Sequence, residues 1–201
     1  MFIVCLDLEG VLAPEIWINI AKKTGIKELQ ITTRDEPDYD KLMNKRLQIL
    51  KENNITLKLI QNVINGMELL EGARNFIDWL QSVTQVIILT DSFNQFVASI
   101  KKKLGNATIF CHYLEVDEND MISNYFLRIK DMKKVSIRKF KEMNFQVMAI
   151  GDSYNDIEML KEADFGILFK PPENVIKEFP QFVVVDKYSE LKSIISKYLG
   201  F

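Results

Sequence analysis

Two carboxylates directly follow the first apolar run of this sequence. Asp7 and Glu9 come after Phe2–Leu6, and Gly10 then allows the chain to turn. Two carboxylates this close together repel each other, and ionising both costs free energy unless a cation is bound nearby. A carboxylate in such a place can act as a nucleophile while its neighbour transfers protons. An acidic turn after a strand is also common, so this pair alone leaves a structural role open.

A second acidic segment, Gly-Asp-Ser-Tyr-Asn-Asp, follows the apolar run Val147–Ile150. Gly151 permits a tight turn, Asp152 lies in that turn, and Asp156 comes one helical turn later on the same side. If the two apolar runs are strands of one parallel sheet, Asp7 lies with both aspartates at the same edge. A few hard oxygen ligands suit Mg²⁺ completed by water and a substrate phosphate. The sequence therefore predicts a Mg²⁺ site at this edge.

A hydroxyl group that could bind phosphate lies between the two acidic segments. Thr90 and Asp91 follow the apolar run Val86–Leu89, where a helix is expected to begin. The Thr90 hydroxyl and the backbone N–H groups of a helix start form a natural phosphate site. A simple helix cap by Asp91 or Ser92 is the alternative for this segment.

Three lysines precede the second acidic segment, at the start of an expected helix. They are Lys130, Lys133 and Lys134. An ammonium group in the acidic site would neutralise the nucleophile and hold the phosphate. Most such lysines are simply solvated, and spacing does not decide which of the three points inward.

The elements that position these residues follow from the hydrophobic pattern. Five apolar runs rich in β-branched residues show no alternation with polar residues, as is typical of strands covered on both faces. Amphipathic helical segments lie between them, which indicates an α/β fold with a Rossmann-like parallel sheet and ligands at the carboxyl ends of the strands. The expected strands are Phe2–Leu6, Val86–Leu89, Val147–Ile150, Gly166–Phe169 and Phe182–Val185. The expected helices are Ala73–Val83, Ser92–Leu104, Lys133–Met143, Ser153–Ala163 and Lys187–Leu199, and a hairpin is expected from Thr108–Val116 and Met121–Ile129.

One long segment between the first and second strands contains only helical patterns. We interpret residues 14–71 as a small helical cap inserted into a catalytic core formed by residues 1–13 and 72–201. Its expected helices are Glu15–Thr24, ended by Gly25, Tyr39–Glu52, placed after Pro37, and Thr56–Asn65, with Thr56 as the N-cap.

The composition is that of a globular chain with no electrostatic reason to bind nucleic acid or a membrane. The 201 residues are 47% hydrophobic, and 26 basic residues nearly balance 28 acidic ones, for a net charge of −2. No apolar stretch approaches the ~18 residues of a membrane span, so we expect a cytoplasmic protein. Cys5 and Cys111 lie in apolar runs and are expected to be buried thiols. His112, the only histidine, also lies in an apolar run, which argues against a histidine-based zinc or triad site.

The ordered set of motifs resembles the haloacid dehalogenase-like phosphohydrolases. The set is Asp-x-Glu after the first strand, Thr after the second, Lys before the last site strand, and Gly-Asp-x-x-x-Asp after it. Over nearly its whole length the chain is similar to the phosphoserine phosphatase branch, in particular to its bifunctional phosphoserine phosphatase/phosphoserine:homoserine phosphotransferase members. The stretches that carry this similarity are CLDLEGVLAPEIW, TTRDEPDYDKLM, KRLQIL, GDSYND and PENVIKEFPQF. Glu9 departs from the usual superfamily Asp and matches the phosphotransferase group, and Thr90-Asp91 stands where ordinary phosphoserine phosphatases have Ser-Gly.

The resemblance implies a role for each matching residue. Asp7 would carry the phosphoryl group as an aspartyl phosphate, and Glu9 would be the general acid and base. Mg²⁺ would be held by Asp7, Asp152 and the backbone carbonyl of Glu9, with Asp156 in support. The phosphate-binding residues would be Thr90, Asp91 and Lys133, with Lys134 as the alternative lysine. The residues that bind the amino-acid part of phosphoserine would be Glu15, Arg46 and Asn155, although by position alone Arg46 is more typical of an exposed helix residue. Hydrolysis would give serine and phosphate, and homoserine would be a second acceptor.

Three other functions are compatible with parts of this pattern. A related phosphatase could act on another small phosphomonoester, such as a sugar phosphate, because the cap sets specificity. A receiver-type signalling module also gathers acidic residues, Thr and Lys around Mg²⁺, but its phosphorylated Asp follows a middle strand and no cap is inserted. An inactive relative could serve as a binding protein, although all the motif carboxylates are present.

Overall fold

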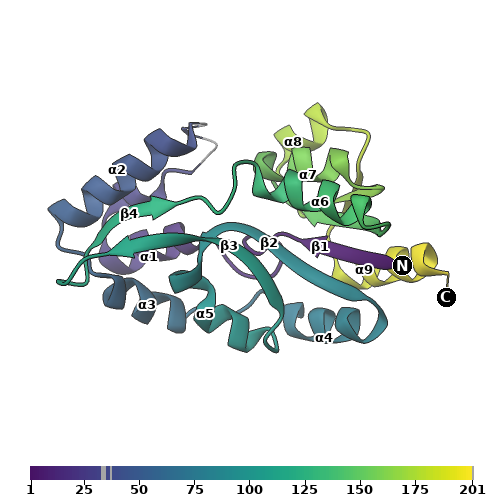
Figure 1. Cartoon of the computed structure of the whole chain (residues 1–201), viewed down its shortest axis with the longest axis horizontal. Coiled ribbons are helices and arrows are strands. Elements are labelled where there is room, and N and C mark those ends of the chain that lie inside the picture. The colour runs from purple at the N-terminus through teal and green to yellow at the C-terminus, as the bar shows by residue number, and fades with distance from the viewer. Residues whose placement is uncertain (33–34, 37, 201) are drawn as a thin grey trace.

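Seven strands form one sheet in the computed structural model, which describes residues 1–32, 35–36 and 38–200. The strand order is β4-β3-β2-β1-β5-β6-β7, and neighbouring strands are parallel except for the antiparallel pair β3 and β4 (Figure 1). This confirms the predicted α/β class. The strands are β1 (Phe2–Leu6), β2 (Gln85–Phe93), β3 (Thr108–Val116), β4 (Ile122–Phe126), β5 (Gln146–Gly151), β6 (Phe165–Phe169) and β7 (Val183–Val185).

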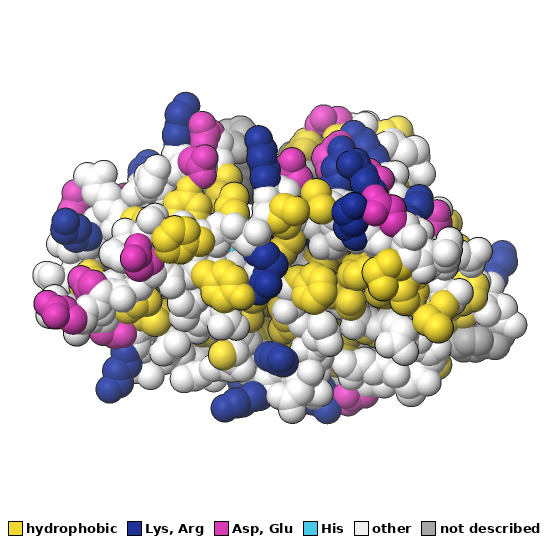
Figure 2. Space-filling view, in the orientation of Figure 1, with side chains coloured by type: hydrophobic (Ala, Val, Ile, Leu, Met, Phe, Trp, Pro, Cys, Tyr) yellow, Lys and Arg dark blue, Asp and Glu magenta, His cyan; other side chains and the backbone are white. Residues whose placement is uncertain are grey.

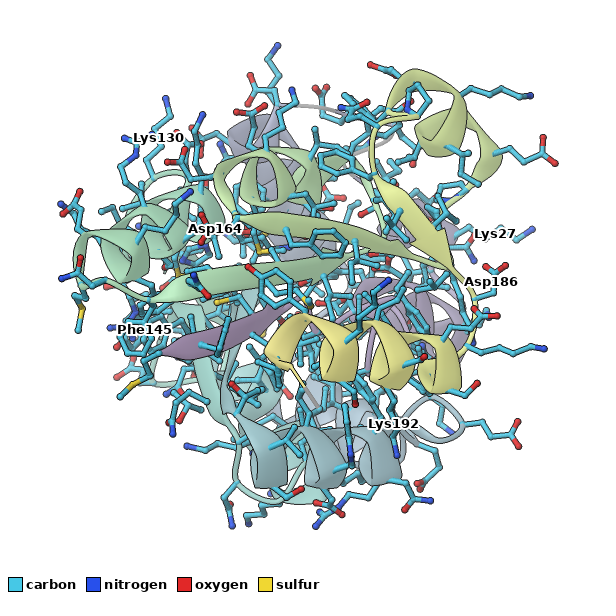
Figure 3. The ribbon with its side chains drawn as sticks, turned by 90° about the vertical axis from the view of Figure 1, so that its right-hand side faces the viewer. Lys27, Lys130, Phe145, Asp164, Asp186 and Lys192 are labelled. Carbon is cyan, nitrogen blue, oxygen red and sulfur yellow. The ribbon has the colours of Figure 1, made fainter. Side chains whose placement is uncertain are left out.

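Helices cover both faces of the sheet (Figures 1 and 3). One face carries α4 (Ala73–Val83), α5 (Asn94–Lys103) and α9 (Tyr188–Leu199), and the other carries α6 (Met132–Glu142), α7 (Ile157–Glu162) and α8 (Glu173–Glu178). In β1, Val4 and Leu6 pack on the first face, and Ile3 and Cys5 pack on the second. Because successive strand side chains point to opposite faces, a strand covered on both sides is apolar without alternation.

Apart from the isolated β-bridge at Thr56, the regular secondary structure described in the 14–71 segment is helical. It contains α1 (Ile16–Thr24), the short 3₁₀ helix η1 (Lys27–Gln30), α2 (Tyr39–Glu52) and α3 (Leu57–Asn65). Gly25 ends α1 at φ 77° with its N–H on the Ala21 carbonyl, and the Thr56 hydroxyl accepts the Leu59 N–H, as predicted. The helix η1 was not predicted, because four residues are too few to show a periodic pattern. Pro37, and Thr33 and Arg34 of the stretch TTRDEPDYDKLM, lie outside the described residues.

Strand β2 is longer than its apolar run, and this corrects the predicted start of the following helix. The prediction ended the strand at Leu89 and began the helix at Ser92, but the strand continues to Phe93 and α5 begins at Asn94. Pairing with β3 resumes after an irregularity, with Phe93 opposite His112. A helix cap by Asp91 or Ser92 is therefore wrong, and Thr90 offers its hydroxyl from a strand rather than from a helix start. In the same way, the predicted helix Ser153–Ala163 begins as the 3₁₀ turn η2 (Tyr154–Asp156) before α7.

The predicted hairpin is present as β3 and β4, and its turn contacts the 14–71 segment. The Asp120 carbonyl and carboxylate accept the N–H groups of Leu57 and Lys58, both at 2.8 Å, at the start of α3. Thr56 and Met121 form an isolated β-bridge beside them. The turn of the hairpin thus anchors the start of α3.

Exposed charges of both signs are interspersed on the face shown in Figure 2, over α6 and its neighbours, in line with the small net charge. Within the described residues, no helix is both long and apolar enough to cross a membrane. Cys5 and Cys111 are buried free thiols, as predicted.

Candidate active site

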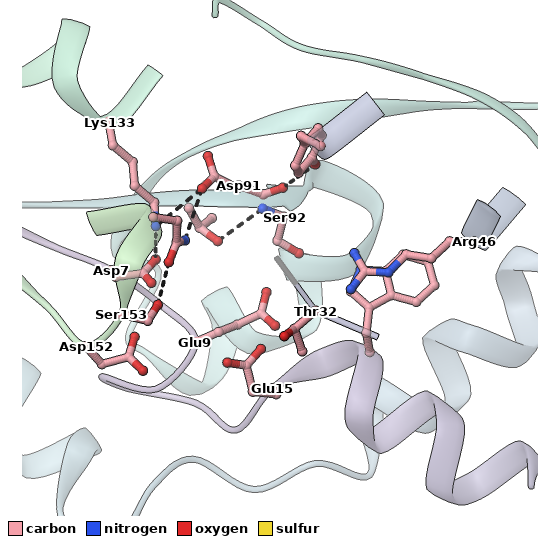
Figure 4. A pocket seen from close by; sticks show the side chains of 14 residues that line it. Asp7, Glu9, Glu15, Thr32, Arg46, Asp91, Ser92, Lys133, Asp152 and Ser153 are labelled. Atoms are coloured by element: carbon pink, nitrogen blue, oxygen red, sulfur yellow. Dashed lines mark hydrogen bonds and ion pairs between the residues drawn. The ribbon is translucent and has the colours of Figure 1, made fainter. Parts of the chain in front are cut away.

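A pocket of about 90 Å³ lies where the carboxyl ends of β1, β2 and β5 face α1 and α2. Figure 4 shows Lys133, Asp7 and Asp152 at one end of this pocket, Arg46 at the other, and Glu9 and Glu15 between them. Every residue that the sequence assigned to the site lines the pocket except Asp156, which is fully buried behind it. The predicted residues in the lining are Asp7, Glu9, Glu15, Arg46, Thr90, Asp91, Lys133, Asp152 and Asn155.

Lys133 is the lysine that reaches the acidic residues. Its Nζ lies 3.0 Å from Asp7 Oδ1, 2.8 Å from Asp156 Oδ1 and 3.5 Å from Asp91 Oδ2, and its side chain is buried. Burial alone would lower the pKa of Lys133, but the three carboxylates, Asp156 most of all, raise it well above its usual value. The ammonium group therefore stays charged. Lys134 instead pairs with Glu158 at the surface, at 2.6 Å. The structure thus identifies which of the two lysines points inward, a choice that sequence spacing left open.

Asp156 holds the turn that carries Asp152. Its Oδ2 accepts the N–H groups of Asp152 at 2.9 Å and Ser153 at 3.2 Å, while Oδ1 accepts the Lys133 ammonium. A Cβ atom at Gly151 would lie 2.3 Å from the Asp156 side chain, so this close packing requires glycine. With three donors on its carboxylate, Asp156 fits a supporting role better than direct metal ligation.

The carboxylate cluster has the donor set of a magnesium site. Asp7, Asp152 and Asp156 each offer an oxygen, and these atoms lie within 4.8 Å of one another. Burial, with repulsion from Asp156 and Asp152, raises the pKa of Asp7 well above its usual value even though Lys133 opposes the shift. The single ammonium group of Lys133 therefore does not neutralise the three carboxylates. A set of ligands made only of oxygen atoms suits Mg²⁺. Gly10, at φ 80°, permits the close approach, since a Cβ there would lie 2.4 Å from the Asp152 carboxylate.

Glu9 points away from this cluster and toward the start of α1. Its Oε2 accepts the Ile16 N–H at 2.8 Å. Burial, with the charge of Glu15, raises the pKa of Glu9 to about 8, against the opposing effects of the Ile16 N–H and Arg46. A carboxyl group that is protonated at neutral pH can donate a proton to a leaving oxygen.

Arg46 is buried on the inner side of α2, so its interpretation as an exposed residue is wrong. Its guanidinium carbon lies 4.4 Å from the centre of the Trp17 ring, and its Nη2 donates to the Ile31 carbonyl at 2.8 Å. Its Nε is buried with no hydrogen-bond partner among the described residues. Burial lowers the pKa of Arg46 to about 10, although Glu9, Tyr39 and Glu15 favour its charged form. The helical spacing of the buried residues Leu42, Met43, Arg46, Ile49 and Leu50 is a signal that could have revealed this.

Some residues of the pocket were not assigned to it from the sequence. Tyr39 donates its hydroxyl to the Asp91 carbonyl at 3.0 Å, and Trp17 packs on Phe96 and also lines the pocket. Only the tertiary structure places these aromatic residues beside the carboxylates. The other unassigned lining residues are Thr32, Ser92 and Ser153.

Asp91 is held by cationic and polar neighbours on several sides. Burial alone would raise the pKa of Asp91, but Lys133, His112 and Asn155 hold it far below its usual range. Asn155 donates to Asp91 Oδ2 at 3.2 Å. Asp91 therefore remains ionised in the pocket wall.

Comparison with known proteins identifies the family of the chain. The model of a family described as haloacid dehalogenase-like hydrolase matches residues 3–164. The chain belongs to this family. As a haloacid dehalogenase-like hydrolase, it is an enzyme of the class that the order of motifs indicated, and a receiver-type module has no support.

Relatives within the family are named phosphoserine phosphatases. The chain is 54% identical over 192 residues to "Phosphoserine phosphatase ThrH" of Pseudomonas aeruginosa, covering 96% of this chain and 94% of that protein. It is also 54% identical over 190 residues to a phosphoserine phosphatase of Pseudomonas syringae pv. tomato, covering 94% and 80%. The resemblance to the phosphoserine phosphatase branch is confirmed.

Solved structures share the fold. The structure entitled "Phospho-Aspartyl Intermediate Analogue of Phosphoserine phosphatase" superposes with a TM-score of 0.79 at 22% identity, covering 96% of this chain and 98% of that one. A substrate-bound phosphoserine phosphatase complex gives the same TM-score and identity, covering 98% and 97%. At this identity the comparison confirms the architecture of the family.

Proposed function

We propose that this hydrolase is a Mg²⁺-dependent phosphoserine phosphatase that works through an aspartyl phosphate on Asp7. The observation that carries the proposal is the arrangement of charge along one small pocket. Lys133 and the carboxylate cluster lie at one end, and the buried Arg46, with an Nε that lacks a partner among the described residues, lies at the other. A phosphate monoester with a carboxylate at its far end matches that distribution. The names of the relatives support the same substrate.

The residues that would hold Mg²⁺ are Asp7, Asp152 and the backbone carbonyl of Glu9, with Asp156 supporting the turn. When bound, the ion supplies positive charge that offsets the charge of the phosphoryl oxygens. Lys133 adds a second positive charge, and the Thr90 hydroxyl, which is buried at the end of the pocket, adds a hydrogen-bonding group.

In the first half-reaction, the Oδ2 atom of Asp7 attacks phosphorus. Oδ1 is already engaged by the Leu8 N–H at 2.8 Å and by Lys133, which orients the carboxylate for attack through its other oxygen. A bond forms between Oδ2 and phosphorus, and the bond between phosphorus and the serine oxygen breaks. Glu9 gives its proton to that oxygen, and serine leaves.

In the second half-reaction, Glu9 takes a proton from the entering hydroxyl group. The oxygen of that group bonds to phosphorus, and the bond to Asp7 Oδ2 breaks, which restores both carboxyl groups. Water as the entering group gives inorganic phosphate. Homoserine carries the same ammonium and carboxylate groups as serine, so we propose it as an alternative acceptor that yields phosphohomoserine.

We propose that the 14–71 segment is the cap of this site. It contributes Glu15, Trp17, Tyr39 and Arg46 to the pocket, while the core contributes Lys133 and the carboxylates of Asp7, Glu9, Asp91 and Asp152. A cap of this kind excludes water while the amino acid is held. Glu15 would pair with the ammonium group of the substrate, and Asn155 would bind beside it.

The direct test measures phosphate release from phosphoserine with Mg²⁺ and with EDTA. We expect repeated turnover with Mg²⁺ and none with EDTA. The same reaction with added homoserine should form phosphohomoserine, detected by mass spectrometry. Absence of Mg²⁺-dependent phosphate release would overturn the proposed function. Absence of phosphohomoserine would exclude only homoserine as an acceptor.

Replacing Arg46 tests which substrate the pocket recognises. Arg46→Met keeps apolar packing against Trp17 but removes the charge, so it should raise KM for phosphoserine by roughly 10- to 100-fold, the usual value of a charge-assisted hydrogen bond. KM for p-nitrophenyl phosphate, which has no carboxylate, should change less than about threefold. Steady-state kinetics on both substrates measures the difference. An equal effect on both would remove Arg46 from substrate recognition and favour another phosphomonoester.

A further inference from the structure

His112 lies beside the active site although the reaction proposed above gives it no part. It belongs to β3, opposite Phe93 of β2, and only 3% of its surface is exposed. Both ring nitrogens face polar groups. Nδ1 accepts the backbone N–H of Arg128 at 3.2 Å, and Nε2 lies 3.7 Å from Asp91 Oδ1. Because Nδ1 is an acceptor, the proton of the neutral ring is on Nε2 and faces Asp91.

The Asp91 carboxylate connects this histidine to the catalytic lysine. Its Oδ2 lies 3.5 Å from Lys133 Nζ and accepts the Asn155 amide at 3.2 Å, while Oδ1 faces His112. Asp91 directly follows Thr90 in the wall of the pocket. A carboxylate that turned from this position toward a bound phosphate would repel it and would no longer hold the lysine.

We propose that His112 is a positioning residue that orients the Asp91 carboxylate by electrostatic attraction between its Nε2–H and Oδ1, across 3.7 Å. With Oδ1 attracted to the imidazole, Oδ2 stays directed at Lys133 and Asn155, and the ammonium group of Lys133 stays beside Asp7. The inference rests on the proposed function, in which Lys133 binds the phosphoryl group. It deepens that function by assigning a role to the only histidine of the chain.

Two substitutions separate this role from a structural one. In His112→Asn, the amide oxygen can still accept the Arg128 N–H, but no donor reaches Asp91. In His112→Gln, the longer side chain places an amide N–H near the position of Nε2. We expect His112→Asn to lower kcat about tenfold with phosphoserine and with p-nitrophenyl phosphate, since misplacing Lys133 affects phosphoryl transfer itself. KM for phosphoserine should change less than about threefold, and His112→Gln should recover most of kcat.

A double substitution tests whether His112 acts through Asp91. In an Asp91→Asn background, His112→Asn should not lower kcat further, because the carboxylate that His112 orients is absent. Thermal unfolding of each variant checks that the protein is folded. Equal losses in His112→Asn and His112→Gln, or losses that multiply in the double variant, would overturn the inference.

Nuclear magnetic resonance gives a readout that does not depend on turnover. Because the chain has a single histidine, the ¹⁵N signals of its imidazole need no assignment. We expect the Nε2–H tautomer in the wild type and a displaced Nε2 signal in Asp91→Asn. An Nδ1–H tautomer, or an Nε2 chemical shift that is the same in the wild type and in Asp91→Asn, would overturn the inference. A protein that shows the pairing but does not hydrolyse phosphoserine would instead refute the proposed function, so the two failures are distinguishable.

Discussion

Asp7→Asn is expected to abolish turnover of phosphoserine while leaving the metal-free protein at least as stable as the wild type. An asparagine Oδ1 can keep the Leu8 N–H and Lys133 contacts of Asp7 Oδ1. The amide nitrogen that replaces Oδ2 is not a nucleophile, so the covalent pathway is lost. We expect kcat to fall by on the order of 10⁴-fold or more. Phosphate release with Mg²⁺ measures this loss.

The stability of Asp7→Asn follows from the sign of the pKa shift of Asp7. Burial and neighbouring carboxylates raise the pKa of this group above its value in the unfolded chain. A carboxyl group whose pKa is raised in the folded state destabilises the folded protein once the pH exceeds the pKa of that group in the unfolded chain. At neutral pH, a neutral amide at this position therefore removes the free-energy cost of burying the ionised carboxylate. Thermal unfolding in EDTA should give an equal or higher midpoint for Asp7→Asn.

Asp78→Asn provides the matched control for this prediction. Asp78 lies on α4, about half exposed and paired with Arg74 at 2.8 Å, and it is not among the residues that line the pocket. It should keep wild-type turnover. Residual turnover in Asp7→Asn together with a lowered unfolding midpoint would show that Asp7 has a structural role and that another residue is the nucleophile.

Lys133→Met is expected to have the largest effect on stability. It leaves the buried carboxylates Asp7 and Asp156 without the ammonium group that lies within 3.0 Å of both. Removing one partner of a buried ion pair costs about 3–5 kcal/mol, because the remaining charge is buried and uncompensated. Urea unfolding in EDTA measures the change, and turnover should be lost as well. Saturating Mg²⁺ should restore part of the stability, since a cation bound only to the folded state stabilises it by mass action.

Lys134→Met is the control for Lys133→Met. The two lysines are adjacent on α6, but Lys134 pairs with Glu158 at the surface, where solvent screens the interaction. It should change neither unfolding nor turnover appreciably. If the two variants lost similar stability, Lys133 would not be the cation that holds the acidic cluster together.

Elements with a strong local pattern were predictable from the sequence. The bounds of β1, α2 and α4 agree with the prediction because apolar periodicity and end signals agree there. Thr56 begins α3, and Gly25 ends α1, through bonds within a few residues. The end of β2 was misplaced because the polar residues Thr90, Asp91 and Ser92 interrupt its apolar run, and the strand continues to Phe93, where pairing with β3 resumes.

The chemistry of the site divides in the same way. Asp7, Asp152 and Thr90 follow apolar runs, and in a parallel sheet the carboxyl ends of neighbouring strands meet, so their sequence positions predict that they converge. That inference needs only the order of strands and the types of the residues that follow them.

Other parts of the site depend on contacts between segments far apart in the chain. Whether Lys133 or Lys134 points inward depends on how α6 lies against β5, and the burial of Arg46 depends on α2 packing over Trp17. His112 comes within 3.7 Å of Asp91 only because β3 joins β2. The sequence by itself thus determined which acids follow which strands, since strand order and residue type are local. Only the tertiary structure decided which side chain of each helix or neighbouring strand faces them, because that choice is made by packing between distant segments.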